Sequence, residues 1–384
     1  MRIVHVANFY GPSSGGIRTT LHKLGKGYIQ RGHEFIFIVP GNGFYRETTP
    51  MGERITVKSL MIPFSGGYRV IRSNSKLRKL LLELAPDRIE VSDRFTLSSI
   101  GIWAASRKIP AVVFSHETLS GLAARYFPFS LTWFVNWHNR RLALRFDHVV
   151  TTTHYAAREF EEIGTKNLVQ IPLGVDLETF TPYAFDFQVR QHLIQGADYL
   201  LVHVGRMSPE KCPLRSIAAV TELGNRGYNV RLVYIGIGPM WKRMRTEAEG
   251  MPVTFMGYIA NRHKVAAILA SSDLSLAPGP IETFCLAALE SIASGTPVVA
   301  SATSAVGEIL SSSQNCSTGS LADNTTDSFA DAIERVLISK DSQSSTSCRE
   351  QAERFSWDRT INAMLQLHGI DKEHQSEPST FGVA

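Results

Sequence analysis

The chain has 384 residues, of which 43% are apolar and 20% are charged, a composition typical of soluble globular proteins with two domains. Its longest apolar runs are strand-sized and its first residues contain no signal-peptide core, so we expect a cytoplasmic protein without membrane-spanning helices. A net charge of +5 is too weak to indicate nucleic-acid binding, and four separated cysteines without a Cys-x-x-Cys pair predict reduced thiols rather than disulfides or a zinc site.

The first residues, 2–10, are apolar and predict a buried strand. A loop over residues 11–16 follows, and apolar residues then recur at helical spacing from Ile17. A strand that leads through a glycine loop to a helix N-terminus is suited to phosphate binding. Gly15 and Gly16 are therefore candidate phosphate contacts, although a tight turn between strand and helix needs glycine for steric reasons alone.

Strands and helices alternate through the rest of the first half, which predicts a parallel sheet flanked by helices. The expected strands are residues 34–39, 88–91 and 111–114, and the expected helices are residues 75–84 and 97–107. Ligands bind at the carboxyl ends of such strands, and the polar residues expected there are Asn8, Asp93, Arg94 and His116. His116 is a candidate site residue, although a histidine at a strand end is more often hydrogen-bonded for structural reasons.

Two segments of the first half combine basic and apolar residues. Residues 69–82 place Arg and Lys around a leucine-rich helix, and residues 125–146 interleave Phe and Trp with Arg. This composition is typical of a helix that lies on an anionic lipid surface. The alternative is that the apolar side chains pack in the core while the arginines are solvated, and each segment taken alone favours that alternative.

Residues 171–176 predict a short connector into a second domain, where the alternation of strands and helices begins again. After the expected strand of residues 199–204, Arg206 and Lys211 flank a turn at which two cations can bind a diphosphate. A surface salt bridge with Glu210 is the alternative. Towards the end of the chain, a helix is expected over residues 357–367.

Segments rich in Ser, Thr and Asn occur late in the chain. Residues 311–328 and 339–348 predict loops, and residues 371–384 predict a disordered tail.

Two glutamates eight positions apart, Glu282 and Glu290, mark the centre of the candidate site. The pattern predicts a helix that begins near Thr283 and ends at Gly295 before an apolar strand. The free N–H groups at the helix start can then donate to ligand oxygens, while the two carboxylates accept from hydroxyls on different parts of a long ligand. The alternative is that Glu282 compensates the helix dipole and Glu290 is solvated, but the turn residues on both sides favour a site.

These groups together suit a nucleotide sugar, which contains a diphosphate and two sugar rings. Arg206 and Lys211 would bind the diphosphate, and the two glutamates would bind one sugar each. No Asp-x-Asp sequence occurs in the chain, so we expect these two cations, rather than a metal ion, to balance the leaving diphosphate. No cofactor besides the nucleotide-sugar substrate is expected.

At these residues the chain resembles the retaining GT-B glycosyltransferases of family four. Two matching elements lie in the second half of the chain: Gly-Arg-x(4)-Lys at residues 205–211, and Glu-x(7)-Glu with a trailing Gly-Thr-Pro at residues 282–297. The connector at residues 172–176 and a terminal Phe-Ser-Trp at residues 355–357 also match. The resemblance implies an α/β fold in which two Rossmann-like domains face each other across a cleft. It implies an acceptor domain over residues 1–172 and a donor domain over residues 173–350. A helix over residues 351–370 would cross back to the first domain, and residues 371–384 would form a tail.

The resemblance also implies a role for each matching residue. Glu282 and His116 would be the catalytic residues, with Glu282 on the hydroxyls of the donor sugar and His116 near its reacting carbon. Glu290 would bind the ribose, and same-face attack with the leaving phosphate as base would retain the configuration. The further donor-binding residues would be Gly15, Gly16, Arg206, Lys211, Thr283, Phe284 and Cys285. The family's usual Gly-Phe-Gly after the first Glu is Thr283-Phe284-Cys285 here, and the larger residues could narrow the loop.

Within the family, four segments resemble the mannosyltransferases that elongate phosphatidylinositol mannosides from GDP-mannose, most closely those that form an α-1,6 linkage on the dimannoside. The segments are residues 8–12, 14–19, 90–94 and 115–117. The implied partners are a nucleotide sugar and a glycolipid at the inner face of the plasma membrane, where the two basic, apolar segments would dock the enzyme. The candidate acceptor-binding residues are Asn8, Tyr10, Arg69, Arg72, Asp93 and Arg94.

Other functions stay open on the sequence. A member of the same family could use another nucleotide sugar or a non-lipid acceptor, because the base is expected near residues 257–261, where backbone contacts could serve several bases. A nucleotide-sugar 2-epimerase can share the architecture but would need acid–base side chains beyond His116 and Glu117. A non-enzymatic nucleotide-sugar-binding protein is a third possibility, and the sequence does not indicate an oligomeric state.

Overall fold

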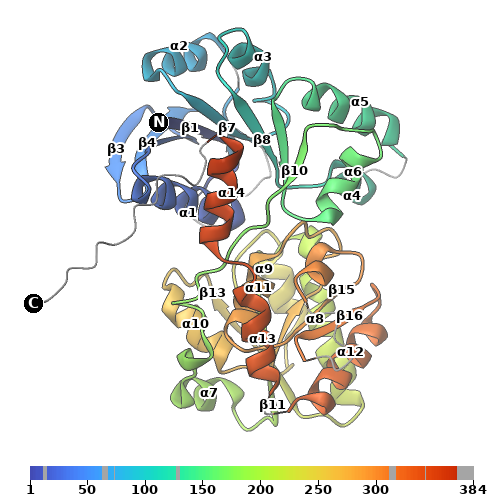
Figure 1. Ribbon diagram of the computed structural model, residues 1–384. Coiled ribbons are helices and arrows are strands. Elements are labelled where there is room, and N and C mark those ends of the chain that lie inside the picture. Colours follow the sequence, from blue (N-terminus) through green and yellow to red (C-terminus); the bar gives the residue numbers. More distant parts are fainter. Residues whose placement is uncertain are drawn as a thin grey trace, which may run out of the picture.

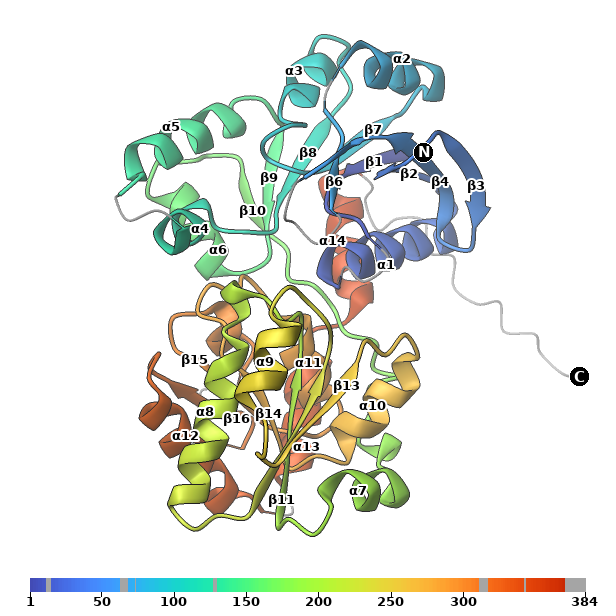
Figure 2. The ribbon, with the colours of Figure 1, turned by 180° about the vertical axis from the view of Figure 1, so that it is seen from behind.

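The computed structural model describes residues 1–11, 15–62, 68–72, 74–126, 130–310, 317–341 and 343–369. These residues form two α/β domains, one above the other in Figure 1, with helices on both faces of each sheet (Figures 1 and 2). The tail of residues 371–384, the aromatic residues Phe127 and Phe129, and Cys316 lie outside the described residues. Cys212, Cys285 and Cys348 carry free thiols.

The N-terminal domain is built on an eight-stranded sheet of order β10-β9-β8-β7-β1-β2-β4-β3, in which only the β3–β4 pair is antiparallel. Its strands are β1 (Arg2–Ala7), β2 (Glu34–Gly41), β3 (Tyr45–Thr49), β4 (Gly52–Lys58), β7 (Arg88–Ser92), β8 (Ala111–Ser115), β9 (His148–Thr151) and β10 (Leu168–Gln170), and β5 (Leu60–Met61) pairs separately with β6 (Arg69–Val70). Its helices are α1 (Gly16–Gln30), α2 (Ser75–Leu84), α3 (Ser99–Ala105), α4 (Leu119–Tyr126), α5 (Thr132–Ala143) and α6 (His154–Glu161).

The C-terminal domain has a six-stranded parallel sheet of order β13-β12-β11-β14-β15-β16. Its strands are β11 (Tyr199–Val204), β12 (Val230–Ile235), β13 (Val253–Gly257), β14 (Leu274–Ala277), β15 (Val298–Ser301) and β16 (Gly319–Ala322). Its helices are α7 (Phe187–Ile194), α8 (Pro213–Asn225), α9 (Trp241–Glu247), α10 (Arg262–Ala270), α11 (Leu286–Ala293), α12 (Thr326–Ser339) and α13 (Ser344–Glu353), with short 3₁₀ turns η1 (Pro182–Ala184), η2 (Pro209–Lys211) and η3 (Ala305–Glu308).

The last helix, α14 (Trp357–Leu367), returns to the N-terminal domain and lies beside α1 (Figure 1). Arg31 at the end of α1 pairs with Asp358 at 2.9 Å and also donates to Asn362. A Cβ atom added at Gly27 would lie 2.1 Å from Ile361 Cδ1, so only a glycine lets the two helices approach this closely. The predicted fold class, two Rossmann-like domains with a returning C-terminal helix, is thereby confirmed.

Several element boundaries predicted from the sequence were wrong. The first strand ends at Ala7 rather than residue 10. The polar segments 311–328 and 339–348 are not loops throughout, because α12 begins at Thr326 and α13 at Ser344. Helix α12 begins there because the Thr325 side chain accepts from Ser328 N, and α13 buries Ser344 and Cys348, so local capping and packing override the polar composition. The first six residues of the former segment lie outside the described residues.

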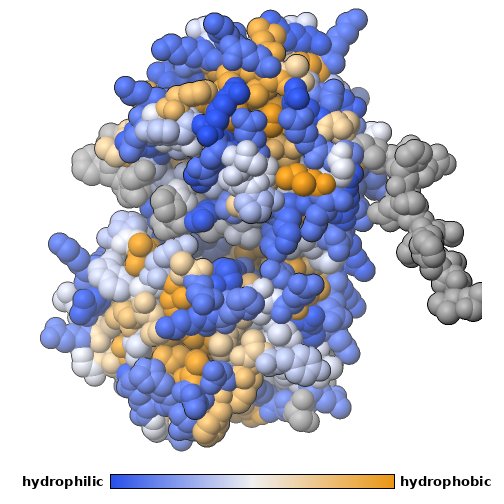
Figure 3. All heavy atoms as spheres, turned by 90° about the vertical axis from the view of Figure 1, so that its left-hand side faces the viewer, coloured by the Kyte–Doolittle hydropathy of each residue, from blue (hydrophilic) through white to orange (hydrophobic). Residues whose placement is uncertain are grey.

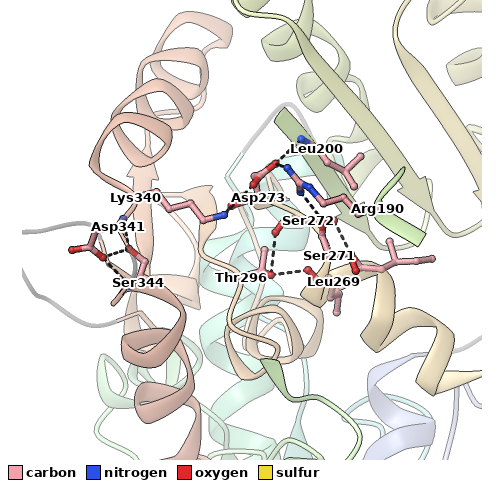
Figure 4. Close-up of polar contacts among 11 residues, drawn as sticks. Arg190, Leu200, Leu269, Ser271, Ser272, Asp273, Thr296, Lys340, Asp341 and Ser344 are labelled. Carbon is pink, nitrogen blue, oxygen red and sulfur yellow. Dashed lines mark hydrogen bonds and ion pairs between the residues drawn. The ribbon is translucent and has the colours of Figure 1, made fainter. Parts of the chain in front are cut away.

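A polar cluster holds the turn that follows α11, at the end of the C-terminal sheet where β11 and β14 begin (Figure 4). Thr296 Oγ1 donates to Leu269 O at 2.6 Å, and Asp273, at the start of β14, accepts from Leu200 N at 2.8 Å. Arg190 of α7 and Lys340 beyond α12 pair with the same carboxylate at 2.9 and 3.1 Å. Thr296 thus ties the Gly-Thr-Pro turn to α10, and Asp273 joins the start of β14 to β11, α7 and Lys340.

Replacing Asp273 by Asn is expected to lower the free energy of unfolding by about 3 kcal/mol at pH 7, because two cations lose a largely buried partner. Burial alone would raise the pKa of Asp273, but Lys340, Leu200 N–H and Arg190 outweigh it and lower the pKa below the ordinary value. Its stabilising contribution is therefore complete above about pH 4 and is lost as the pH falls through the folded pKa. Denaturant titrations from pH 7 to pH 3 should show the difference from the native chain shrinking, whereas the exposed Asp198→Asn should change little at any pH. A difference independent of pH would contradict the argument.

Within the described ranges, no helix combines the length and the apolar character that are needed to cross a membrane. On the face seen in Figure 3, hydrophobic residues gather in separate patches on both domains, and hydrophilic residues surround them.

Candidate functional site

The loop between β14 and α11 carries Glu282 and begins the helix later than predicted. Helix α11 starts at Leu286, because its N-cap, Cys285, adopts a left-handed conformation with φ 68° and ψ 75°. The N–H groups of Thr283, Phe284 and Cys285 therefore belong to the loop before the helix rather than to its first turn. A non-glycine residue in this conformation costs roughly 1–2 kcal/mol, so the larger residue is held there against a local strain.

Glu282 lies against Lys211, although the two residues are 71 positions apart in the chain. Glu282 Oε1 and Lys211 Nζ are 2.6 Å apart, and the carboxylate side chain is 12% exposed. Burial alone would lower the pKa of Lys211, but Glu282, Cys285 and Glu210 outweigh it and raise the pKa. Lys211 therefore keeps its charge. Each partner has spare hydrogen-bonding capacity, because an ammonium has three donors and a carboxylate has about four acceptor positions.

The loop after β11 holds both predicted cations in a defined frame. Met207 is fully buried, its N–H donates to Ile237 O, and its carbonyl accepts from Met240 N. Lys211 lies in η2 and points to Glu282, whereas the Arg206 guanidinium lies over the Tyr68 ring of the N-terminal domain at 4.7 Å. Lys211 does not form the alternative surface salt bridge with Glu210, because its ion pair is with Glu282.

Glu290 has a partner that the sequence reasoning missed. Arg262, the first residue of α10, donates to Glu290 Oε1, and its guanidinium lies over the Phe180 ring at 4.7 Å. Glu290 is buried rather than solvated, and burial raises its pKa while Arg262 opposes the rise. Only its position in the sequence could have indicated Arg262 as a site residue, because it directly follows residues 257–261, where a nucleotide base was expected.

Thr283 joins the two domains at the centre of the site. Its hydroxyl donates to the backbone carbonyl of His116 at 2.5 Å, and its own carbonyl accepts from the hydroxyls of Thr152 and Thr153 at 3.2 and 2.8 Å. A glycine at this position could not make the first bond. The departure from the family's Gly-Phe-Gly thus adds a direct tie between the glutamate loop and the strand end that carries His116.

His116 follows β8 at the carboxyl edge of the N-terminal sheet. Its Nε2 lies 2.8 Å from Ser92 Oγ, and its ring stacks on Phe114 at 5.6 Å between centroids. Burial, with a smaller contribution from His5, lowers the pKa of His116 to about 3, so the ring is neutral at physiological pH. The structure brings His116, Glu282 and Lys211 to the two sides of one interdomain site, through Thr283.

The six candidate acceptor residues do not form one group. Asn8 and Asp93 are buried and bind each other, and Arg94 is buried with hydrogen bonds to Glu159, Asn139 and the Glu117 carbonyl. These three side chains hydrogen-bond within the N-terminal domain, and their assignment as acceptor ligands stays a prediction.

The other three candidate acceptor residues lie nearer the surface. Tyr10 contacts His22 Nε2 through its hydroxyl at 2.8 Å, Arg69 donates to Ser59 O, and Arg72 is exposed. Gly15 and Gly16 are exposed at the N-terminus of α1, and a Cβ atom added to either would meet no atom within 4 Å. The steric explanation for these two glycines is therefore not supported by packing within the described residues.

Two family models match the chain, and together they cover most of it. The model described as Glycosyltransferase Family 4 matches residues 14–179, and the model described as Glycosyl transferases group 1 matches residues 184–355.

Relatives and solved structures agree with these models. The chain is 45% identical, over 96% of both chains, to the GDP-mannose-dependent alpha-(1-6)-phosphatidylinositol dimannoside mannosyltransferase of Mycobacterium tuberculosis. Its fold is similar to that of a sucrose-phosphate synthase from Thermosynechococcus elongatus, with a TM-score of 0.76 at 18% identity over 96% of this chain and 98% of the other. It is also similar to Anabaena HepE in complex with UDP, with a TM-score of 0.72 at 16% identity over 96% and 100% of the two chains.

Proposed function

The chain belongs to the family 4, group 1 glycosyltransferases, and from that membership we propose that it transfers mannose from GDP-mannose to a phosphatidylinositol mannoside. The observation that carries the proposal is the 45% identity, over nearly the whole of both chains, to a mannosyltransferase with that donor and a dimannoside acceptor in its name. The new bond is an α linkage, the configuration at the sugar is retained, and no metal ion takes part. The Lys211–Glu282 pair supports the donor half of this proposal.

At the donor, the charges of the site match the parts of a nucleotide sugar. Lys211 donates to a diphosphate oxygen with the hydrogens that it does not use on Glu282, and Arg206 adds a second positive charge from the same loop. Glu282 accepts from hydroxyls of the mannose, with the N–H groups of Phe284 and Cys285 beside it. Glu290, held by Arg262, accepts from the ribose. Gly15 and Gly16, which carry no side chain, let the diphosphate approach the N-terminus of α1.

The reaction exchanges one bond at the anomeric carbon of mannose. The bond from this carbon to the diphosphate oxygen breaks, and a bond to the acceptor hydroxyl oxygen forms on the same face. The acceptor proton passes to the leaving phosphate oxygen, whose negative charge Lys211 and Arg206 stabilise as it develops. His116, neutral and tied to the donor loop through Thr283, contacts the sugar next to the reacting carbon.

A thermal-shift comparison of GDP, UDP and ADP, followed by product analysis with radiolabelled GDP-mannose, tests the proposal. GDP should stabilise the protein most, because a ligand that binds only the folded state raises the melting temperature. Labelled mannose should then appear in the lipid fraction only when phosphatidylinositol dimannoside is added. Stabilisation by UDP alone would contradict the proposal that the donor is GDP-mannose. Formation of an epimerised nucleotide sugar in the absence of acceptor would show that the protein is a 2-epimerase and not a transferase.

We further propose that α5 docks the enzyme on the membrane that holds the acceptor. The leucines of α2 at positions 77, 80, 81 and 84 are buried and Leu82 is exposed, so most of the apolar side chains of that segment pack in the core. In α5, Val135 and Leu142 are buried, but the aromatic side chains are exposed. Trp133 is 79% exposed and Trp137 is 42% exposed, and Leu144, which follows the helix, is 87% exposed. The Arg141 guanidinium lies over the Trp137 ring at 4.9 Å, which places a cation beside the exposed aromatic surface.

The double variant Trp133→Ser, Trp137→Ser is expected to bind vesicles containing anionic phosphatidylinositol at least about tenfold more weakly than the native chain. Each indole loses roughly 2 kcal/mol of apolar burial in the lipid interface. Vesicle co-sedimentation at low and physiological salt measures the effect. The matched control is Phe187→Ser on α7, which removes an aromatic side chain that is 64% exposed on the other domain and should not change binding. Equal binding of the double variant and the native chain would rule out docking through α5.

A further inference from the structure

The 3₁₀ turn η3 of the C-terminal domain touches both the Glu282 loop and the N-terminal domain. On one side, the Ala305 N–H donates to the Glu282 carbonyl at 2.9 Å. On the other side, the Glu308 carboxylate accepts from the backbone N–H groups of His154 and Tyr155 at 2.8 and 2.6 Å. These are the first two residues of α6, which lies at the boundary between the domains (Figures 1 and 2). Glu308 therefore links the support of the Glu282 loop to the other domain.

Helix α6 does not satisfy its first N–H groups by itself. The first N–H groups of a helix have no acceptor within the helix. The Thr153 side chain caps one of them, Ala156 N, at 3.1 Å, and the first turn of α6 contains no acidic residue. Glu308 supplies the two further acceptors, because the two oxygens of one carboxylate bind both remaining N–H groups. Its negative charge also lies where the dipole of α6 favours it.

Glu308 projects from a firmly anchored part of the C-terminal domain. Its neighbours Ala305, Val306 and Ile309 are fully buried, whereas Glu308 itself is exposed. The Ile309 carbonyl accepts from Gln351 Nε2 of α13 at 2.8 Å, which fixes the end of the turn. Because its neighbours are buried, the backbone of η3 cannot follow α6. The two bonds of Glu308 therefore exist only while the domains keep this arrangement.

The bonds of Glu308 complete a circuit of polar contacts between the domains. The Thr153 hydroxyl donates to the Thr283 carbonyl, and the Thr283 hydroxyl donates to the His116 carbonyl. A cavity of about 350 Å³ lies beside these contacts, and its lining includes Thr153, Phe284 and Glu308. The cavity interrupts the packing between the domains at this place, so hydrogen bonds rather than apolar contacts join them here.

We propose that Glu308 is a positioning residue for the transfer reaction. By binding the N-terminus of α6, it holds the Glu282 loop against the strand end that carries His116. Without its bonds the domains separate more readily, and His116 moves away from Glu282. The contact between Lys211 and Glu282 lies within the C-terminal domain and does not depend on this arrangement. Transfer should therefore respond to Glu308 more strongly than nucleotide binding does.

The variant Glu308→Gln should lower kcat for mannose transfer by about tenfold and leave the dissociation constant of GDP within about twofold. Glutamine has one acceptor oxygen and no charge, and the loss of such a cap changes an equilibrium constant by about tenfold. The double variant Glu308→Gln, His154→Asp restores a carboxylate to the first turn of α6, but from within the helix. It should stay as slow as Glu308→Gln. A native kcat in Glu308→Gln, or recovery of kcat in the double variant, would overturn the inference.

Small-angle X-ray scattering of the full chain without ligand measures the arrangement of the domains directly. Glu308→Lys places a positive charge at the N-terminus of α6, so it should raise the radius of gyration above the native value. The matched control is Glu162→Lys at the exposed C-terminal end of α6, which should leave the radius unchanged. A native radius of gyration in Glu308→Lys would overturn the inference.

The kinetic measurement rests on the proposed function, whereas the scattering measurement does not. A native chain that transfers no mannose would defeat the proposed function, and the scattering of Glu308→Lys would still decide whether Glu308 holds the domains together.

Discussion

Replacing Glu282 by Gln is expected to lower kcat/KM for mannose transfer by about 100- to 1,000-fold. The amide keeps the shape of the side chain but loses the charge, and charge-assisted hydrogen bonds to a reacting sugar are worth roughly 3–4 kcal/mol. The affinity for GDP alone should change little, because Glu282 is assigned to the sugar and not to the nucleotide. Steady-state kinetics with radiolabelled GDP-mannose and calorimetric titration with GDP measure the two quantities.

The matched control for this variant is Glu222→Gln, the same chemical change in a salt bridge with Arg226 on the surface of α8. It should leave transfer unchanged, since neither Glu222 nor Arg226 belongs to the candidate site. A native rate in Glu282→Gln would remove Glu282 from the sugar site. A large loss of GDP affinity would move its contact from the sugar to the nucleotide.

Replacing Lys211 by Met is expected to lower kcat by about 100- to 1,000-fold and to weaken GDP binding as well. In the proposed mechanism, Lys211 neutralises charge that develops on the leaving diphosphate, and the methionine keeps the length of the side chain without its charge. The Lys242→Met variant, a change of the same kind at an exposed position of α9, is the control and should behave as the native chain. A loss confined to KM would show that Lys211 binds donor and transition state equally.

The two variants are also expected to be strongly coupled. The pair is 2.6 Å apart, so each single change leaves the other charge in the site without its partner. The double variant Glu282→Gln, Lys211→Met should therefore lose less activity than the product of the two single losses, and a double-mutant cycle in kcat/KM measures the difference. Multiplicative losses would indicate that the two residues act on separate parts of the donor.

Much of the architecture was predictable from the sequence because it depends on local patterns. The helices over residues 75–84 and 357–367 were placed at their observed bounds, since leucine periodicity and the Asn74 and Ser356 caps are all local. The alternation of apolar strands with helices fixed the parallel sheets. Boundaries failed where packing or a single residue decides. The left-handed Cys285 delays α11 by three residues, and the Ser-rich segment before residue 348 forms a helix because it packs against α11.

The candidate site was predictable in its residue types but not in its pairings. Glu282 and Lys211 were recognised in separate motifs, whereas their contact depends on how two loops of the donor sheet meet. Asn8, Asp93 and Arg94 looked available at strand ends, but burial and hydrogen bonding within the domain occupy them. Arg262 carries no motif, and only the fold brings it to Glu290.

The sequence by itself determined that the chain forms two α/β domains, and the resemblance of its motifs indicated the glycosyltransferase family. Spacing along one strand or helix carries the information on the fold, because the period of each element fixes which residues share a face. Only the tertiary structure decided what joins the domains and what lies behind His116. The bond from Thr283 to the His116 carbonyl spans 167 positions, and the hydrogen bonds of Glu90 with His5 and His368 join two strands and the last helix. Contacts between residues so far apart arise from packing, and no local pattern in the chain encodes them.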